Sequence, residues 1–407
     1  MSDPMNGDLA ADAQEGWLRA PLSRFLALNV AVVDVDPVQT YPTVGVLNRG
    51  RGLLYRDPVA GSSTAYKKLN RIGPGMLLYS RLKAFEGAIT VTPDDLPESF
   101  ASQEFPTFAF ASDADPEFFR ILTTTQRMWD ALQGASKGMG GRRERVKPAD
   151  FLNIIMDIPP LPVQERIVEV INVVDEQVAA LEVEADSLLR VRNAALGNML
   201  SRGGEGWSSA PLSKTGTLTR GRRFVKSDYV EAGLGCIHYG QIYTDYGASA
   251  TETVTYLPGS FRVSMRLAQT GDVVIAGTSE NVEDVGKAVA WLGDDDVAVH
   301  DDCFIFRHEL DPKFVSYFFA SPLFQHQKRQ FTSETKVVRI SAANIKKIVM
   351  PVPPRDEQER ISGMADAADV QIAALRAEAA RLREARVALL SRLLDRTIDI
   401  KSVEAGV

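Results

Sequence analysis

The sequence predicts an α+β chain in which two mixed α/β domains are separated by two long helices that form a coiled coil, with pseudo-twofold symmetry between the halves. Three observations lead to this prediction. A seven-residue apolar pattern starts near Gln164 and recurs near Gln358. The two halves begin with similar residues, and short apolar runs bounded by Gly and Pro fill the segment that precedes each helix.

The apolar pattern after Gln164 has the period of a coiled coil. The first ladder is Ile167, Val174, Leu181, Leu188 and Ala195, with Val170, Val178, Ala185, Val191 and Met199 between its steps. The second ladder, 194 residues later, is Ile361, Ala368, Leu375, Leu382 and Leu389, supported by Met364, Ile372, Ala379 and Leu393. A 3.5-residue period predicts left-handed supercoiling against a partner helix. Because one chain contains both ladders, we expect them to pair with each other.

The repeat extends to the segments before the helices. Residues 17–23 correspond to 207–213, and residues 115–118 correspond to 311–314. The middles of the halves differ, because the segment 45–52 has no close counterpart around 236–241. The sequence therefore predicts two copies of one scaffold that carry different loops.

The repeat also gives the expected boundaries. We expect a disordered tail at 1–16, a first domain at 17–158, a central long helix at 159–202, a second domain at 203–352, and a C-terminal long helix with a tail at 353–407. Apolar runs predict strands at 31–33, 76–79 and 88–91, then a helix at 116–132. In the second domain they predict strands at 272–275, 288–291 and 303–306, then a helix at 312–327.

Composition predicts an ordinary soluble protein of the cytoplasm. No apolar run approaches the roughly 20 residues needed to span a bilayer, and the polar N-terminus does not resemble a signal peptide. Cys236 and Cys303 are too few for a disulfide framework. They form two Cys/His pairs with His238 and His300, but the spacing fits a zinc site poorly. We therefore expect no metal site.

Motifs for catalysis are missing as well. The Gly138-Met139-Gly140-Gly141 run lacks the Lys and Ser/Thr of a nucleotide-binding P-loop. The segment Asp157-Ile158-Pro159-Pro160 departs from the Asp-Pro-Pro-aromatic motif of amino-methyltransferases, because Ile158 interrupts it and no aromatic residue follows. The prediction is a non-catalytic chain without a cofactor of its own.

The distribution of charge permits a nucleic-acid partner despite the net charge of −7. Residues 1–15 carry four acids and no base, and the helix 164–202 carries seven acids against four bases, so the remainder is balanced. Within that remainder basic residues cluster at 137–147, 220–226 and 328–339. Arg and Lys in Gly-containing loops are suited to contacts with a phosphate backbone. For each cluster, a solvated basic loop is an equally good interpretation.

The arrangement resembles the DNA-specificity subunit of Type I restriction–modification enzymes. The residues that carry the resemblance are the two Gln-Glu-Arg-Ile helix starts at Gln164 and Gln358, each after a Pro-Pro pair, and the stretch 136–146. It covers nearly the whole chain, from Trp17 to about Arg396. The resemblance implies two target recognition domains and an antiparallel coiled coil that spaces them. It also implies that the subunit reads one half of a bipartite, asymmetric double-stranded DNA target with each domain.

The resemblance further implies partners that perform the chemistry. Two DNA methyltransferase (modification) subunits would supply methylation with S-adenosylmethionine, and restriction/translocase subunits would supply cleavage with ATP and Mg²⁺. A helix of about 38 residues spans roughly 57 Å, which admits half-sites more than one DNA turn apart. The coil is therefore a candidate spacer.

These considerations give the candidate site residues. The expected DNA-binding residues of the first domain are Asn48, Arg49, Arg51, Arg81, Lys83, Lys137, Arg142, Arg143 and Arg145. Those of the second are Arg220, Arg222, Arg223, Lys226, His238, Tyr239, Gln241, Ser279, Asn281, Lys336 and Arg339. By resemblance, the partner-docking residues are Gln164, Glu165, Arg166, Gln358, Glu359 and Arg360. A charged first helical turn explains the docking residues equally well.

Three alternatives stay open at this stage. One is a non-catalytic coiled-coil scaffold that assembles proteins without DNA. Another is the DNA-recognition subunit of a different phage-defence or modification complex. The third, a self-contained nuclease or methyltransferase, is disfavoured by the missing motifs.

Overall fold

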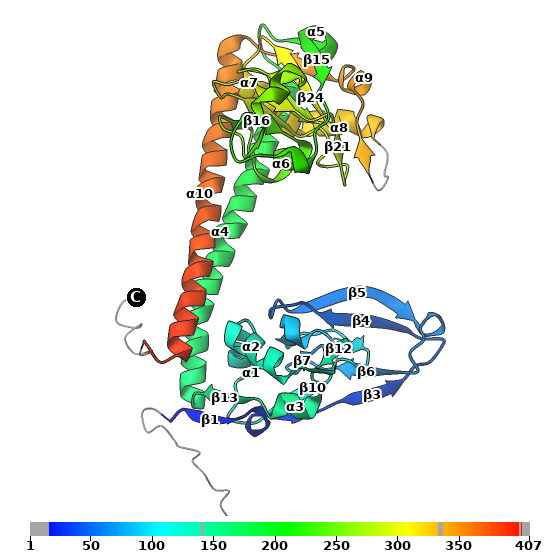
Figure 1. The fold of residues 1–407 in the computed structure, drawn as a ribbon, viewed down its shortest axis with the longest axis vertical. Coiled ribbons are helices and arrows are strands. Elements are labelled where there is room, and N and C mark those ends of the chain that lie inside the picture. The colour runs from blue at the N-terminus through cyan, green and yellow to red at the C-terminus, as the bar shows by residue number, and fades with distance from the viewer. Residues whose placement is uncertain (1–15, 140–141, 333–336, 399, 401–407) are drawn as a thin grey trace, which may run out of the picture. The chain divides into compact units, whose positions relative to one another are not determined.

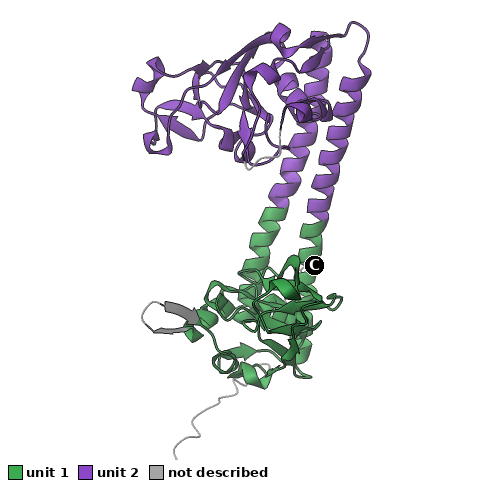
Figure 2. Ribbon diagram, turned by 90° about the vertical axis from the view of Figure 1, so that its right-hand side faces the viewer, with its two compact units in different colours: residues 1–179, 379–407 green, residues 180–378 purple. Residues whose placement is uncertain are grey.

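The computed structural model describes residues 16–139, 142–332, 337–398 and 400. For residues 137–139 and 142–144 it describes the backbone alone. The expected tail at 1–16 lies outside these residues, apart from Gly16. The chain divides into two compact units, which Figure 2 distinguishes by colour: residues 1–179 with 379–407, and residues 180–378. The fold class is confirmed, because each unit has mixed helices and sheets and two long helices run through the chain (Figure 1).

The central sheet of unit 1 has four antiparallel strands in the order β2-β10-β7-β8. A second, five-stranded sheet has the order β3-β6-β9-β4-β5, and two-stranded pairs join β1 to β13 and β11 to β12. The strands are β1 (Leu18–Pro21), β2 (Leu26–Leu28), β3 (Ala31–Asp34), β4 (Thr40–Val46), β5 (Leu53–Ala60), β6 (Lys68–Ile72), β7 (Leu77–Tyr79), β8 (Ile89–Val91), β9 (Ser99–Ala101), β10 (Thr107–Phe110), β11 (Lys137–Met139), β12 (Arg142–Arg145) and β13 (Ile155–Ile158).

The helices of unit 1 cover this sheet with aromatic side chains. They are α1 (Pro116–Leu122), α2 (Gln126–Ala135) and α3 (Pro148–Leu152), with 3-10 turns η1 (Leu22–Arg24), η2 (Gly61–Ser63) and η3 (Ala84–Glu86). Phe108, Phe118, Phe119 and Phe151 are fully buried in one cluster. Burial of this apolar surface is the main source of stability in such a domain.

Unit 2 repeats this frame. Its main sheet has the order β15-β24-β20-β22-β17, whose first four strands correspond to β2-β10-β7-β8, and β14 pairs with β26 as β1 pairs with β13. The strands are β14 (Ser208–Pro211), β15 (Gly216–Arg220), β16 (Leu234–Ile237), β17 (Ser249–Ala250), β18 (Thr255–Leu257), β19 (Leu267–Ala268), β20 (Val273–Ala276), β21 (Thr278–Ser279), β22 (Ala288–Trp291), β23 (Val297–Val299), β24 (Cys303–His308), β25 (Val338–Arg339) and β26 (Val349–Val352).

The second sheet of unit 2 differs from that of unit 1. It has four strands in the order β18-β16-β23-β19, and it lies beside helix α6, which unit 1 lacks among its described residues. The helices are α5 (Leu212–Thr215), α6 (Tyr239–Thr244), α7 (Pro312–Ala320), α8 (Pro322–Lys328) and α9 (Ala342–Ile345), with 3-10 turns η4 (Lys226–Asp228), η5 (Gly259–Val263) and η6 (Arg329–Phe331). The common frame thus carries a different second sheet in each unit.

The two predicted helices at 116–132 and 312–327 are each two helices, so those predictions were wrong. Between α1 and α2, the hydroxyls of Thr123, Thr124 and Thr125 donate to carbonyls of the preceding turn at 2.6–2.7 Å. Thr125 then accepts a hydrogen bond from Met128 N as the N-cap of α2. Ser321 caps α8 in the same way, with Pro322 in the first turn. Capping side chains and Pro at the first helical position favour a new helix start over continuation.

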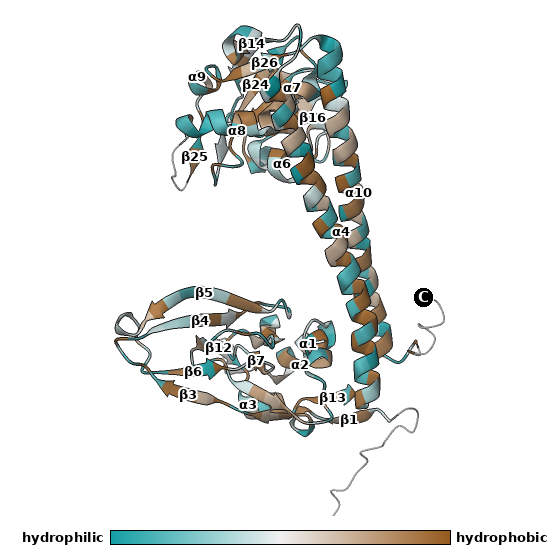
Figure 3. Cartoon of the chain, turned by 180° about the vertical axis from the view of Figure 1, so that it is seen from behind, coloured by the Kyte–Doolittle hydropathy of each residue, from teal (hydrophilic) through white to brown (hydrophobic). Residues whose placement is uncertain are grey.

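The long helices are α4 (Leu161–Arg202) and α10 (Arg355–Leu394). They are antiparallel within each unit: Asp175 pairs with Arg386 in unit 1, while Asp186 pairs with Arg376 and Arg192 with Asp369 in unit 2. Apolar residues are distributed along both helices (Figure 3). Neither helix, nor any other in the described part of the chain, combines the length and apolarity needed to cross a membrane.

The seam follows the predicted ladder with one error. Ile167, Leu181 and Ile361 are buried, as are the intermediate Val178 and Ala185. Val191, predicted to lie in the stripe, is 61% exposed. The alternating four- and three-residue spacing from Ala185 and Leu188 instead places Arg192 in the seam, where its side chain is 12% exposed.

Candidate nucleic-acid interface

The predicted basic residues of unit 1 gather around the turn η3. Asn48 and Arg49 lie in the connection between β4 and β5, and the Asn48 amide donates to Glu86 Oε2 at 2.6 Å. The Arg49 guanidinium lies 5.6 Å from the centre of the Trp129 ring, a cation–π contact. Gly50 N donates to Gly87 O at 3.2 Å. These contacts fix the β4–β5 connection against Trp129 of α2 and against residues 81–87, hereafter the η3 segment.

Asn48 and Arg49 are thereby engaged within the protein. Arg49 has a left-handed backbone with φ of 59°, which is uncommon for a residue with a side chain. Arg51 is exposed, and its Nε donates to Asn48 O at 3.0 Å. Arg49 is exposed as well, whereas Asn48 is half-buried.

Arg81 and Arg145 flank one carboxylate. Glu104 lies 3.3 Å from Arg145 and 3.8 Å from Arg81, and Val146 N donates to Arg81 O. Arg81 Nε and Glu104 Oε2 are buried without a hydrogen-bond partner among the described residues. Lys83, on the same segment, is exposed and lies 3.5 Å from Glu86. The structure therefore brings Arg81, Lys83 and Arg145 together at one edge of unit 1.

Three predicted residues of the first domain have no described side chain. Lys137 is in β11, and Arg142 and Arg143 are in β12, the two strands of an antiparallel hairpin. The backbone of this hairpin ends at Arg145, beside Arg81. The segment predicted as a Gly-rich loop thus contains two strands.

In unit 2, Arg220 and Arg339 line one cavity of about 430 Å³ together with Thr278, Asp301 and Asp302. Arg220 Nε donates to Asp301 O at 2.6 Å, and Arg339 pairs with Thr278 between β25 and β21. Both arginines are exposed. Two residues from distant parts of the sequence therefore meet at this cavity, which corresponds to the Arg81 and Arg145 edge of unit 1.

The next basic group of unit 2 follows strand β15. Arg222, Arg223 and Lys226 are exposed, and Arg222 donates to Ser264 O at 3.0 Å. Arg266, which the sequence did not single out, donates to Arg220 O at 2.5 Å. Within the described residues Arg223 and Lys226 form no ion pair, so their charges face solvent.

Helix α6 uses two of the predicted reading residues for its own N-terminus. His238 Nδ1 accepts from Gly240 N at 3.1 Å, and Gln241 Oε1 accepts from His238 N at 3.0 Å. Gln241 is 3% exposed and its amide donates to Thr255 at 2.8 Å. Burial, then the nearby His300, lowers the pKa of His238. The structure assigns Gln241 to the interior because both ends of its amide are bonded there, whereas Tyr239 is half-buried at the surface.

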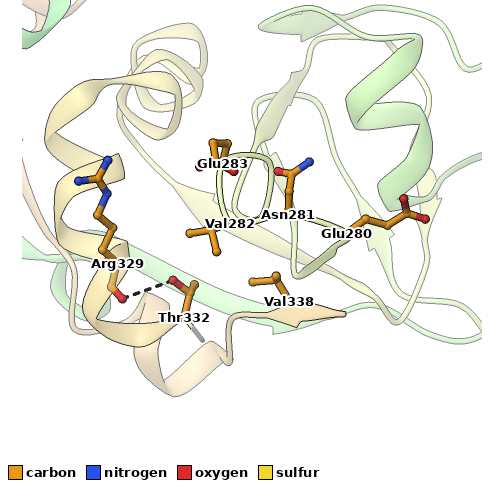
Figure 4. Close-up of a pocket in the computed structure, with 7 residues that line it drawn as sticks. All are labelled: Glu280, Asn281, Val282, Glu283, Arg329, Thr332 and Val338. Carbon is orange, nitrogen blue, oxygen red and sulfur yellow. Dashed lines mark hydrogen bonds between the residues drawn. The ribbon is translucent and has the colours of Figure 1, made fainter. Parts of the chain in front are cut away.

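Residues 277–286, hereafter the β21 loop, contain Ser279 and Asn281. Ser279 is 3% exposed, and the Asn281 side chain bonds to Asp284 at 2.7 Å through both its oxygen and its nitrogen. The exposed carboxylates of Glu280 and Glu283 are the additional polar groups here, and sequence reasoning missed them. With Arg329 and Thr332 they line a cavity of about 640 Å³ (Figure 4). Lys336 lies outside the described residues.

Cys236 and the two neighbouring histidines are hydrogen-bonded to protein groups, and Cys303 is buried. Cys236 Sγ lies 3.2 Å from Thr255 Oγ1, and burial raises the pKa of both Cys236 and Cys303. His300 contacts Phe224 O through Nε2 and accepts from Asp302 N through Nδ1. His300, Asp301 and Asp302 have ligand atoms within 4.8 Å of one another, but the ring nitrogens are already bonded. The arrangement gives no positive indication of a metal.

The glutamines of the two repeated helix starts are interior residues. Gln164 is fully buried; it donates to Pro159 O at 2.8 Å and accepts from Asp115 N at 2.8 Å. Gln358 makes the matching bonds to Pro353 O at 2.8 Å and from Asp311 N at 2.7 Å. Each amide therefore ties a long helix to its own domain and is closed to a partner protein. Glu165, Glu359 and Arg360 are exposed, and Arg166 is half-buried.

Comparison with known proteins gives one curated relative. The chain is 22% identical over 293 residues to the Type I restriction enzyme MjaVIII specificity subunit of Methanocaldococcus jannaschii, covering 67% of this chain and 68% of the relative. No protein-family model matches the chain.

The fold is shared with a solved chain from a type I R-M system, whose structure addresses complex assembly and conformational transition. The TM-score is 0.60 at 20% identity, with 93% of this chain and 97% of the other covered. HsdS of Thermoanaerobacter tengcongensis (TM-score 0.44, 19% identity, 93% and 96% covered) and the S subunit of M. genitalium (0.48, 12%, 95% and 98%) match more loosely. The predicted resemblance is thereby confirmed: the chain has the fold of a solved chain from a type I R-M system and is similar in sequence to a curated Type I restriction enzyme specificity subunit.

Proposed function

We propose that this chain is the DNA-specificity subunit of a Type I restriction–modification complex and is itself non-catalytic. The observation that carries the proposal is the repeated frame: the main sheets of the two units share four corresponding strands, with basic residues gathered at one edge around the η3 segment or the β21 loop. Each unit then reads one half of a bipartite double-stranded target. Because the second sheets differ, the two half-sites differ in sequence.

Guanidinium and ammonium groups at the surface supply the contacts. In unit 1 these belong to the exposed Arg51 and Lys83 and the half-buried Arg81 and Arg145; in unit 2 they belong to the exposed Arg220, Arg222, Arg223, Lys226 and Arg339. Lysines and most arginines contact phosphate, which gives affinity without sequence information. Arginines that reach base edges in the major groove pair bidentately with guanine. Asn48 and Gln241 support the loops from within, whereas Arg49 and Asn281 are exposed and also contact neighbouring protein groups.

The partners are methyltransferase subunits and, for cleavage, restriction/translocase subunits. The repeated helix starts offer two equivalent surfaces, one with Glu165 and Arg166 and the other with Glu359 and Arg360. Two copies of a modification subunit fit two such surfaces. S-adenosylmethionine, ATP and Mg²⁺ belong to these partners, in keeping with the missing nucleotide-binding motifs in this chain.

Salt-dependent DNA binding tests the proposal. The double variant Arg223→Ala/Lys226→Ala removes two exposed charges, so the slope of log affinity against log salt should fall by roughly 2 for duplex DNA. Lys214→Ala is the control, because Lys214 is exposed in α5, which precedes β15, whereas Arg220 is the last residue of that strand. Equal slopes for the wild type and the double variant contradict the assignment, and absence of duplex binding by the wild type complex contradicts the function.

A further inference from the structure

The β21 loop presents exposed carboxylates at the edge of the main sheet of unit 2. It connects β20 to β22, and its exposed side chains include Glu280 and Glu283. Carboxylates at a base edge accept hydrogen bonds from the amino group of cytosine. Such a role requires a loop with a fixed conformation, because a mobile loop would lose entropy on binding.

A buried lysine forms hydrogen bonds with the backbone of this loop. Lys328, the last residue of α8, is 1% exposed. Its Nζ donates to Glu283 O at 2.8 Å and to Val285 O at 2.7 Å, and it lies 5.6 Å from the centre of the Phe324 ring. The ammonium group thus joins two backbone carbonyls of the β21 loop to α8.

The end of the loop is closely packed against the same helix. Gly286 has φ of 86°, and a Cβ at this position would lie 2.8 Å from the Phe324 ring. Gly286 N donates to Ala276 O at 2.8 Å, which closes the loop at its base. Lys328 and Phe324 therefore determine where residues 283–286 lie.

Unit 1 has a different residue at the equivalent of Lys328. Thr125 and Ser321 are the N-caps of α2 and α8, and the residues seven positions later are Leu132 and Lys328. Leu132 is fully buried. The frame consequently accepts a leucine at this position. In unit 1 the η3 segment packs against α2 through Gly87 and Trp129, and Asn48 and Gly50 form hydrogen bonds with Glu86 and Gly87; no lysine of α2 takes part in these contacts.

Lysine is a costly choice for an interior position. An ammonium group loses its hydration on burial, and two carbonyl acceptors for three N–H donors compensate this loss incompletely. Burial accordingly lowers the pKa of Lys328 to about 8. Leucine avoids this cost at the corresponding place in unit 1, so the stability of the frame does not explain the lysine. The two hydrogen bonds from Lys328 to the β21 loop do explain it.

We propose that Lys328 is a positioning residue for DNA recognition by unit 2, which fixes the β21 loop so that Glu280 and Glu283 meet the second half-site. This rests on the proposed function. It assigns to Lys328 a role distinct from the phosphate contacts expected of the basic cluster at 328–339, because the ammonium group points to the loop backbone and not to solvent.

Hydrogen–deuterium exchange without DNA tests whether Lys328 fixes the β21 loop. Lys328→Leu copies unit 1, and Lys328→Met retains an unbranched chain without donors. In the full chain with its partners, the amide of Gly286 should exchange at least about tenfold faster in both variants, while amides of β24 stay unchanged. Lys214→Leu, which removes an exposed charge from the same unit, should leave the loop unchanged. Unaltered exchange at Gly286 in both folded variants overturns the proposal.

Discrimination between half-sites tests the role in recognition. Binding is measured to duplexes altered in one half of the wild-type methylation motif. Both variants should lose about tenfold of their preference for the correct second half-site and retain their preference for the first. Retained preference for both half-sites overturns the role of Lys328. If the wild-type complex shows no sequence preference at all, the proposed function fails. The exchange result still decides whether Lys328 fixes the β21 loop.

Discussion

Arg192 of α4 forms an ion pair with Asp369 of α10, and the positions 194 residues away from each form the reciprocal pair, Asp175 with Arg386. The first pair lies in unit 2 and the second in unit 1. Both arginine side chains are 12% exposed, so each is a charged residue in an otherwise apolar seam. Polar residues at such positions specify the register and orientation of helices in coiled coils.

Reversal of the charge at one end of the unit 2 pair should destabilise that unit. Arg192→Asp places a carboxylate beside Asp369 and should cost about 3 kcal/mol, because a half-buried charge loses its partner. The double variant Arg192→Asp/Asp369→Arg should recover part of this loss. Urea unfolding followed by circular dichroism measures both. The exposed pair Asp186–Arg376 is the control, and its single reversals should cost at most about 1 kcal/mol; equal costs for the two pairs would disprove the role of the seam pair.

Substitution of Gly286 by alanine should destabilise the protein, whereas the same substitution of Gly363 should stabilise it. Gly286→Ala combines a left-handed backbone with a Cβ at 2.8 Å from Phe324, so we expect a loss of about 1–3 kcal/mol. Gly363 lies inside α10 with open space around its Cβ position, so Gly363→Ala should stabilise by about 0.5–1 kcal/mol. Thermal unfolding compares the two. A stabilised Gly286→Ala protein would contradict the described loop conformation.

The stability of unit 2 should depend on pH through Lys328. Its pKa is lowered to about 8, with Asp284, Glu283, Lys287 and Arg329 as the charged groups around it. Between pH 8 and the ordinary lysine pKa the unfolded chain binds the proton that the folded chain has lost. The free energy of unfolding of the wild type should therefore rise through this window relative to Lys328→Leu, by about 3 kcal/mol in total, with no relative change below it. Parallel pH profiles would refute this.

The length of the coil should determine the gap between half-sites. α4 is one uninterrupted helix of 42 residues, so an added heptad lengthens it by about 10 Å, which is close to three base pairs. We would duplicate residues 181–187 in α4 and 374–380 in α10, which preserves the seven-residue ladder in both. Methylation mapping should find the same half-site bases with a gap longer by about two or three base pairs. A changed half-site sequence with an unchanged gap would show that the coil is not the spacer.

Periodicity and repetition made the helices predictable, since they are visible along the chain. The seam was nevertheless misplaced at Val191, because an exposed valine satisfies an apolar pattern as well as a buried one. Arg192 was overlooked for the opposite reason: its charge made it look like a surface residue, and Asp369, its partner, is 177 positions away. The order of the strands in each sheet was beyond prediction for the same reason, because non-local pairings leave no periodic signal.

The candidate site was predictable in composition but not in roles. Arg81 and Arg145, and likewise Arg220 and Arg339, were predicted separately and meet only in the folded units. Residue type alone could not separate Gln241, which closes a helix end, from a base-reading glutamine. The repeat offered one unused signal. Comparison of Leu132 with Lys328 singles out a lysine where the other copy has an apolar residue.

The most direct measurement of the central claim is the sequencing of methylated bases in cells that contain the modification subunits with and without this chain. We predict an asymmetric, bipartite motif that is methylated only when the chain is present. We further predict that Arg81→Ala/Arg145→Ala alters recognition of one half of that motif and that Arg220→Ala/Arg339→Ala alters recognition of the other. Identical methylation in the presence and absence of the chain would contradict the claim that it is the specificity subunit.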